Sequence, residues 1–289
     1  MLKAQGPSGT SQARIQVTAL ALALASILPA GARADELRPE TAQVWDGYVA
    51  AMRVNMERRL STDPFLWIDE DRERARRVRA GEIVVLPGME KNPLEITHAL
   101  IHHWLGAVFV PQATLDQALS VLNDYDRYAE YFTPDIARAH GLTDGGDEQT
   151  FAMVLVAKAL GITAAIDTEM DGRVRRIDTT RAFRYFSTRR VQSIEHFGRS
   201  DEHMDGIDSG PGYVWRLVMA WRLEERDGGV YVEMETLAMS RGIPRGVRWL
   251  IEPTTSELPR KIITHVLEST REAVARGAAV RPTSIGRAP

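Results

Sequence analysis

The sequence predicts an α+β domain in which a curved antiparallel sheet of about seven strands wraps around a long C-terminal helix. Between about residues 135 and 241, apolar and polar residues alternate in runs separated by Gly/Asp turns, which indicates consecutive antiparallel strands. After these runs, apolar residues recur at helical spacing from Leu258 to Val274. A sheet of this kind cannot leave a large apolar face in water, and this amphipathic helix is the long partner that follows it.

The composition is that of an ordinary soluble protein of 289 residues, with 44% hydrophobic and 26% charged residues. The chain has no cysteine, which excludes disulfides, thiolate nucleophiles and thiolate metal sites. Its net charge of −3 argues against a nucleic-acid partner. The sequence has no P-loop, no dinucleotide glycine fingerprint and no HExxH motif, so we expect no cofactor.

Residues 1–34 have the pattern of a cleavable secretory signal peptide. Lys3 and Arg14 precede an apolar run from Ile15 to Leu28, and the small-residue segment "AGARA" ends at Ala34. The apolar run is shorter than the roughly 20 residues that a membrane-spanning helix needs, although an uncleaved anchor is the alternative. We therefore expect an exported protein, periplasmic or secreted, whose mature chain begins at about Asp35.

Residues 35–94 are expected to form an N-terminal helical extension. Pro39 to Leu60 carries apolar residues at helical spacing, among them Trp45, Met52 and Met56. The segment "IDEDRERARRVRAG" continues as a charged helix, and "EIVVLP" indicates a short strand.

The remaining elements follow in order. "THALIHHWLGAVFVP" indicates a long strand, and Thr114 is a suitable N-cap for one or two helices that end at Pro134. Further strands are expected at about 135–143, 147–158, 161–177, 181–197, 213–226 and 229–241, whereas 198–212 has the pattern of a polar loop. The segment "MDGR" at 170–173 fits either a turn or a bulge within one strand. Pro253 is expected to interrupt the C-terminal helix, and residues 277–289 to form a disordered tail.

The last two strands have a register that the sequence itself constrains. A two-residue turn at Asp227–Gly228 matches the twist of a hairpin. The pairs on its apolar face are then Leu223 with Val232, Trp221 with Met234, Met219 with Thr236, and Leu217 with Ala238. The opposite face places Arg222 across from Glu233 and diagonal to Glu235. A slip by one residue would lose both arrangements, so this hairpin is the best constrained element.

With these elements in this order, the chain resembles the START-like helix-grip superfamily, also called SRPBCC. The segments that carry the resemblance are "IHHWLGAVFVPQATLDQALSVLNDYDRYAEYF", "YVWRLVMAWRLEERDGGVYVEMETLAMSRGIP" and "GVRWLIEPTTSELPRKIITHVLESTREAV". They are similar to exported bacterial members of unknown function. The superfamily includes polyketide cyclase, coenzyme-Q-binding and lipid-transfer proteins. The resemblance implies a START-like domain at 95–276 with a deep apolar cavity between sheet and helix, and it implies no role for residues 35–94.

Such a cavity would be lined by the apolar face of the last hairpin and by the facing helix. The expected ligand-binding residues are Trp215, Leu217, Met219, Trp221, Met234, Thr236, Ala238, Arg241, Ile262 and Val266. Methionine and tryptophan suit a bulky apolar ligand. Arg241 is the candidate polar anchor, although a salt bridge explains it equally well. A filled core without a cavity is the alternative interpretation of the same pattern.

No catalytic or metal-binding residue is expected. His98 and His102 share a strand face but lie about 13 Å apart along the strand, too far for one metal ion, and His103 points away. Glu233 and Glu235 fall on the face away from the cavity, where salt bridges explain them. Ser240 has no histidine near it in the sequence, so no Ser-His-Asp arrangement follows.

The leading hypothesis is therefore an exported binding or carrier protein for a hydrophobic small molecule, such as a lipid, sterol, quinone or polyketide-like compound. It would have no nucleic-acid partner, and transient membrane contact would accompany its function. One alternative is a cyclase/dehydrase-type enzyme acting on a polycyclic substrate. Another is a protein-interaction module, which an exposed apolar groove along Trp45, Met52 and Met56 would favour. The sequence leaves the oligomeric state open.

Overall fold

A computed structural model of the chain describes residues 37–143, 146–159, 162–207, 214–241 and 248–280. The predicted signal peptide lies outside these residues. The strands are β1 (Val84–Pro87), β2 (Leu94–Ile96), β3 (Ala99–Pro111), β4 (Ile136–Gly141), β5 (Glu148–Ala159), β6 (Ile162–Arg176), β7 (Arg181–Glu195), β8 (His203–Met204), β9 (Val214–Arg226) and β10 (Gly229–Arg241). The helices are α2 (Pro39–Ser61), η1 (Trp67–Glu70), α3 (Arg72–Arg79), α4 (Leu115–Leu122), η2 (Tyr125–Arg127), α5 (Tyr128–Tyr131) and α6 (Arg248–Val280).

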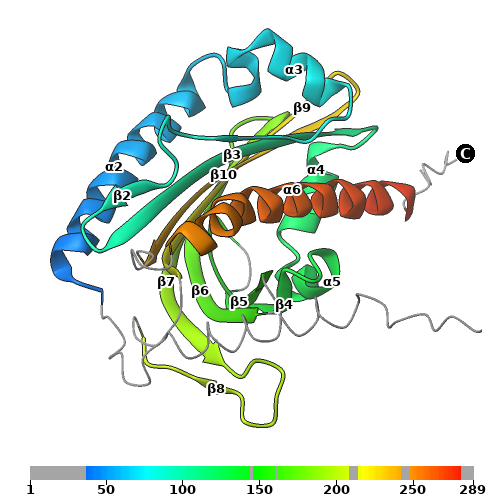
Figure 1. The fold of residues 1–289 in the computed structure, drawn as a ribbon. Helices are drawn as coiled ribbons and strands as arrows, with labels where there is room; N and C mark the ends of the chain where they lie inside the picture. Colours follow the sequence, from blue (N-terminus) through cyan, green and yellow to red (C-terminus); the bar gives the residue numbers. More distant parts are fainter. Residues whose placement is uncertain (1–36, 144–145, 160–161, 208–213, 242–247, 281–289) are drawn as a thin grey trace, which may run out of the picture. The chain divides into compact units, whose positions relative to one another are not determined.

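The strands form one antiparallel sheet that curves around α6 (Figure 1). Their spatial order is β1-β3-β10-β9-β7-β6-β5-β4, with β2 beside β3 and β8 beside β7. This arrangement confirms the predicted α+β class and the helix-grip architecture.

The described sheet has ten strands, so the predicted number of about seven is wrong. The seven strands of the predicted core are all present as β3 to β7, β9 and β10. The additions are β1 and β2, which lie in the N-terminal extension and pair with β3, and β8. Strand β8 lies within the segment predicted as a polar loop, where His203 and Met204 pair with Glu195 and Ile194. A pairing this short leaves no alternation in the sequence.

Strand β6 settles the alternative left open at 170–173, because it runs through that segment without a turn. The irregularity in its pairing with β7 falls between Glu169 and Met170. Gly172 allows the two strands to approach closely, since a Cβ atom at this position would lie 1.9 Å from the carbonyl oxygen of Tyr185.

The predicted register of the last hairpin is confirmed at every pair from Leu223–Val232 to Leu217–Ala238. Asp227 and Gly228 both have positive φ angles, 56° and 76°, as a two-residue hairpin turn requires. The turn therefore sets which residues of β9 and β10 face α6.

Helix α6 covers the concave face of the sheet, where it contacts β3, β10, β1 and α4. Ile263, Leu267 and Val274 join Trp221 and Met234 in one buried cluster. The contact is close, because a Cβ atom at Gly106 of β3 would lie 2.6 Å from a methyl group of Leu267. The helix is continuous from Arg248, so the predicted interruption at Pro253 is wrong. Pro253 is the sixth residue of α6, where it removes one backbone hydrogen bond, but the helix continues through it.

Helices α4, η2 and α5 close one end of the concave face. Thr114 caps α4 as predicted, in a capping box with Gln117. Tyr125 and Tyr128 pack from this segment against Phe151 of β5, and Phe132 packs against Tyr128. This end of the domain is therefore built from stacked and edge-to-face aromatic rings.

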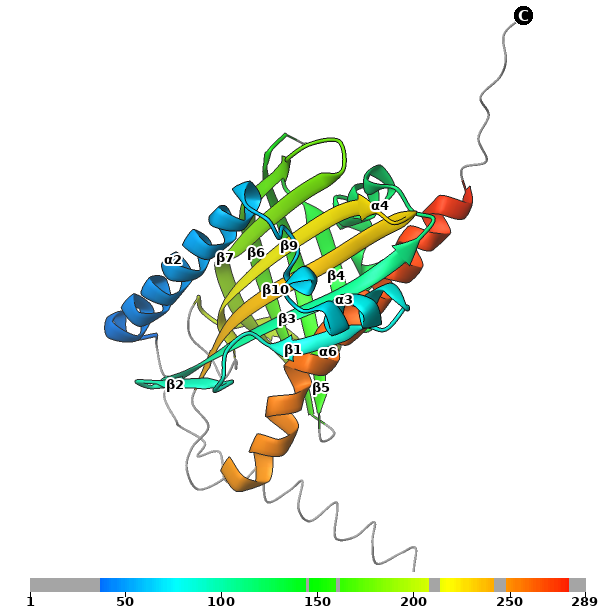
Figure 2. The same ribbon diagram turned by 90° about the horizontal axis from the view of Figure 1, so that it is seen from above.

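The N-terminal extension packs on the convex face of the sheet, opposite α6 (Figure 2). Trp45, Met52 and Met56 of α2 are at most 5% exposed and lie in one cluster with β3, β9 and β10. Further along, Phe65 to Ile68 and Val78 cover β3 and the start of β10. We call α2, η1 and α3 together the outer layer. The sheet is thus covered on both faces.

Charged groups are buried between the sheet and the outer layer. Arg222 is 2% exposed, and its guanidinium lies 2.9 Å from a carboxylate oxygen of Glu235 and 3.8 Å from one of Glu233. The carboxylate of Glu233 accepts the backbone N–H groups of Trp67 and Ile68 at 2.9 and 2.8 Å, which fixes η1 to the sheet. The predicted Arg–Glu pairing is confirmed, but it lies in the protein interior.

His103 and Tyr48 extend this buried network toward α2. The Nε2 atom of His103 lies 2.9 Å from Glu235, and its Nδ1 atom lies 3.0 Å from the hydroxyl group of Tyr48. Burial alone would raise the pKa of Glu235, but the hydrogen bonds and charges of His103 and Arg222 outweigh it and lower the pKa to about 2. Glu235 is therefore a carboxylate whose partners come from two neighbouring strands, β3 and β9, and His103 connects it to Tyr48 of α2.

No helix in the described part of the chain is long and apolar enough to cross a membrane.

Replacing Arg222 by alanine would leave two buried carboxylates without their guanidinium partner. We expect Arg222→Ala to lower the free energy of unfolding by about 3–5 kcal/mol, the scale of breaking one side of a buried ion pair. Urea denaturation followed by circular dichroism measures this change. As the matched control, Arg173→Ala removes an exposed pair with Glu148 and should cost less than about 1 kcal/mol. Equal losses in the two variants would contradict the assignment.

Candidate functional site

The concave face between the sheet and α6 carries most of the residues predicted to bind a ligand. The hairpin register places Leu217, Met219, Trp221, Met234, Thr236 and Ala238 on this face. From α6, Val266 packs against the same cluster, and Ile262 is half-buried one turn earlier. Eight of the ten predicted residues are therefore brought together on the two sides of one interior.

Trp215 and Arg241 lie elsewhere, so their predicted place on the concave face is wrong. Trp215 is 4% exposed and packs in the convex-face cluster with Trp45. The reason is a β-bulge, because Met239 pairs with Arg216 whereas Ser240 pairs with Val214. The extra residue reverses the alternation of side chains, and Trp215 faces outward. Arg241 follows it, with its guanidinium 5.2 Å from the centre of the Trp215 indole.

The concave face differs between its two ends. Trp221 and Leu223, near α4, are buried, and they pack with the second half of α6. Leu217 and Met219, toward the other end, are only half-buried, although their outward neighbours Val218 and Ala220 are 1% exposed. The apolar surface that remains accessible therefore lies on the inward side of β9, next to the half-buried residues of α6.

A buried cation lies on the same face. Arg184 of β7 is 1% exposed and stands directly across from Trp221 in the sheet. Its Nη2 group donates to the hydroxyl group of Tyr125 at 3.0 Å, to that of Tyr128 at 3.5 Å and to the carbonyl oxygen of Leu122. Its Nε–H group is buried and has no hydrogen-bond partner. Arg184 makes no ion pair with any carboxylate of the described residues.

The two tyrosines do not neutralise Arg184. Burial raises the pKa of Tyr125 to about 12, against the opposing effect of the Arg184 charge, and burial likewise raises the pKa of Tyr128. Both hydroxyl groups therefore stay neutral at physiological pH. The guanidinium is a full positive charge held by neutral acceptors.

Tyr125 separates Arg184 from a depression in the surface. This depression has a volume of about 500 Å³, and apolar Leu119 and Val174 line it together with Asn123 and Gln149. Tyr125 lines it as well, and its hydroxyl group donates to the side chain of Gln149. One aromatic side chain thus lies between the depression and the buried charge.

A second polar group faces inward at the far end of the interior. The Nε2 atom of His102 lies 2.9 Å from the hydroxyl oxygen of Ser240, and both side chains are at most 5% exposed. Burial lowers the pKa of His102 to about 4, so the imidazole is neutral near pH 7. Among the described residues, no carboxylate contacts His102 to complete a triad with Ser240. His103 faces the opposite side of the sheet, as predicted.

Arg184 and Tyr125 were not singled out in the sequence, and His102 was considered there only as a metal ligand. Arg184 stands in "RAFRYFSTRR", where inward and outward arginines look alike, and its tyrosine partners lie 56 and 59 positions away. The alternation of side chains in this strand could have indicated the inward position of Arg184, because Arg184 lies on the same face as the apolar Phe186.

Comparison with solved structures finds similar proteins at low sequence identity. A STAR-related lipid transfer protein from Xanthomonas axonopodis has 20% identity and a TM-score of 0.42, and the match covers 65% of this chain and 93% of that one. The Zhui aromatase/cyclase from Streptomyces sp. R1128 has 14% identity and a TM-score of 0.42, with 61% and 94% covered. Human STARD10 has 7% identity and a TM-score of 0.37, with 69% and 79% covered. No protein-family model and no curated protein matches the sequence.

The neutral, buried state of His102 predicts a specific acid sensitivity. The unfolded chain binds a proton near pH 6.5, whereas the folded chain binds it only at about pH 4, so stability falls as the pH drops between these values. The loss from this group is about 3 kcal/mol over the interval. We expect His102→Gln to flatten the dependence of the unfolding free energy on pH in this interval.

Urea denaturation at several pH values between 4 and 7 measures the slope. The control is His140→Gln, since His140 is exposed on β4 and should leave the slope unchanged. An unchanged slope in His102→Gln would show that this histidine does not titrate as its burial implies.

Proposed function

We propose that this chain, which has the START-like fold, is an exported protein that binds a hydrophobic small molecule between the concave face of the sheet and α6. The ligand carries an anionic or carbonyl group at one end. The observation that carries this proposal is the Arg184 guanidinium, a buried charge with an unpartnered N–H group in a largely apolar interior.

The energetic argument starts from the cost of burying a charge. A guanidinium that leaves water without a counter-ion destabilises the folded state by several kcal/mol. Two neutral tyrosines and one carbonyl oxygen recover part of this cost through hydrogen bonds. A ligand with a carboxylate or a polarised carbonyl group would supply the missing acceptor. Such a ligand would therefore gain a charge-assisted hydrogen bond in a dry environment.

The apolar part of the ligand is supported by the residues farther along the same face. Leu217 and Met219 of β9 pack against the same buried cluster as Val266 of α6, and Ile262 lies one helical turn before Val266; all four are half-buried apolar side chains. Methionine adapts its shape to different apolar groups. A chain or ring system in contact with these residues would remove apolar surface from water, at about 25 cal/mol per Å².

The interaction-module hypothesis required an exposed apolar groove on α2, and the structure does not show one along the predicted residues. Trp45, Met52 and Met56 form no exposed groove, because they are buried against the convex face of the sheet. The proposal includes export of the protein and transient contact with a membrane. The predicted secretory signal at residues 1–34 supports export.

The first test is the ligand itself. Mass spectrometry of an organic extract of the purified protein should detect a hydrophobic compound with an acidic or carbonyl end. Protein that carries no compound and takes up none when offered lipids would contradict the proposal.

The second test assigns the polar end to Arg184. We expect Arg184→Met to weaken the binding of a long-chain fatty acid by about tenfold or more, because a hydrogen bond to a charged group contributes about 1.5–3 kcal/mol. Binding of the fatty alcohol of equal length should change by less than about threefold, since it places no charge beside the guanidinium. Titration calorimetry measures both affinities.

Arg190→Met is the matched control, because Arg190 lies on the outward face of the same strand, paired with Asp167. It should leave both affinities unchanged. Equal losses for acid and alcohol in Arg184→Met would show that Arg184 acts on the fold and not on the ligand.

The pair of His102 and Ser240 favours acid/base catalysis as a second candidate function, because the neutral imidazole lies 2.9 Å from a hydroxyl group that it could orient or activate. Extracts of the wild type and of His102→Gln distinguish the two functions. A carrier yields the same compound from both proteins, whereas an enzyme yields an unconverted precursor from the variant.

A further inference from the structure

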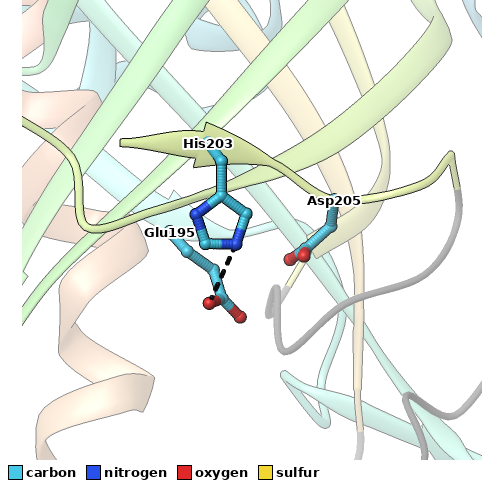
Figure 3. Close-up of side chains that lie close together, drawn as sticks. All are labelled: Glu195, His203 and Asp205. Carbon is cyan, nitrogen blue, oxygen red and sulfur yellow. Dashed lines mark ion pairs between the residues drawn. The ribbon is translucent and has the colours of Figure 1, made fainter. Parts of the chain in front are cut away.

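Three side chains with metal-binding groups converge where β8 pairs with the end of β7. Glu195 is the last residue of β7, His203 the first of β8, and Asp205 follows two positions later. One donor atom from each lies within 4.8 Å of the others. The Nε2 atom of His203 is 3.4 Å from a carboxylate oxygen of Glu195. Figure 3 shows all three side chains turned toward one shared space.

The backbone explains why they converge. Glu195 and His203 are direct partners across the two strands, so their side chains lie on the same face. Asp205 lies two residues beyond His203 and shares that face by the alternation of an extended chain. The backbone of Asp205 is held on both sides, because its N–H group donates to the carbonyl oxygen of Ser193 at 3.0 Å and its own carbonyl oxygen accepts from Gln192 at 2.8 Å.

The histidine is oriented for coordination. The Nδ1 atom of His203 lies 3.2 Å from the backbone carbonyl oxygen of Asp201, so Nδ1 carries the proton. The lone pair is then on Nε2, the atom that faces the two carboxylates. A hydrogen bond from the distant ring nitrogen to a carbonyl group is the usual outer contact of a metal-bound histidine.

Asp205 provides an independent indication. Its Oδ2 atom is buried and has no hydrogen-bond partner, which is rare for a carboxylate oxygen. Burial raises the pKa of Asp205, and the negative charge of Glu195 raises it further, although His203 and Arg241 act in the opposite direction. A cation in the shared space would satisfy the unpartnered oxygen and remove the repulsion between the carboxylates.

We propose that Glu195, His203 and Asp205 form a divalent metal site that binds Zn²⁺. One imidazole and two carboxylates form a mixed nitrogen and oxygen donor set, which suits zinc better than magnesium or calcium. Donor atoms around a tetrahedral zinc ion lie about 3.4 Å apart, so small side-chain rotations close the present arrangement. Three protein ligands leave one position for water or another small ligand.

The ion would fasten β8 and Asp205 to the end of β7. This site stands at the opposite end of β7 from Arg184, and it does not depend on the proposed ligand function. Its failure would leave that function intact.

The test uses the untagged full-length protein after removal of metal with EDTA. Titration calorimetry with ZnCl₂ should show one saturable site, and Zn²⁺ should raise the melting temperature in proportion to its occupancy. We expect His203→Ala and Asp205→Asn each to weaken zinc binding by at least about tenfold, since the loss of an outer-contact partner alone has an effect of this size.

His140→Ala is the matched control, because it removes another exposed histidine from a strand outside the site and should leave the affinity unchanged. MgCl₂ titrated at the same concentrations should bind at least about tenfold more weakly. The absence of saturable zinc binding, or equal affinity in His203→Ala and the wild type, would overturn the proposal. Circular dichroism confirms that each variant is folded.

Discussion

The pairing of Trp221 with Met234 across the last hairpin determines which side chains meet α6 and which lie under the outer layer. Because the side chains of a strand alternate, the same register that turns the apolar residues inward turns Arg222, Glu233 and Glu235 outward. The two faces therefore have opposite chemistry, and each requires its own cover. Helix α6 covers the apolar face by packing, whereas the outer layer covers the charged face through hydrogen bonds to carboxylates.

The outer layer gives residues 37–80 a role that the family resemblance did not imply. Glu233 and Glu235 are buried because η1 and α2 lie above them, and both carboxylates are held by groups from that layer or next to it. Buried ion pairs contribute little net stability, but they penalise every arrangement that leaves one partner alone. The network therefore selects one position of the outer layer on the sheet more than it stabilises the fold. It also keeps the polar groups of the convex face separate from the apolar interior.

Local patterns were sufficient to predict most of the fold. The turn at Asp227–Gly228, the N-cap at Thr114 and the apolar stripe of α6 each depend on neighbouring residues, and all three are confirmed. The errors arose where the decisive contact is distant or irregular. Trp215 faces outward because of a β-bulge, and no residue near it in the sequence indicates that bulge. Strand β8 is too short to show the alternation of apolar and polar residues that identifies a strand. The apolar part of the candidate site could be predicted, because those residues follow from the hairpin register. The polar part could not, because Arg184 and His102 contact partners that are far away in the sequence.

The proposed function depends on an apolar ligand that occupies the inward side of the sheet. The methionines report on this directly, because Met153, Met170, Met219 and Met234 lie on the concave face whereas Met52, Met56 and Met239 lie on the convex face. In a methyl NMR titration of protein labelled at methionine, a bound long-chain fatty acid should shift the first group of signals and leave the second in place. Chemical-shift changes confined to the convex-face methionines, or no change in any methionine signal at saturating fatty acid, would contradict the proposed binding site.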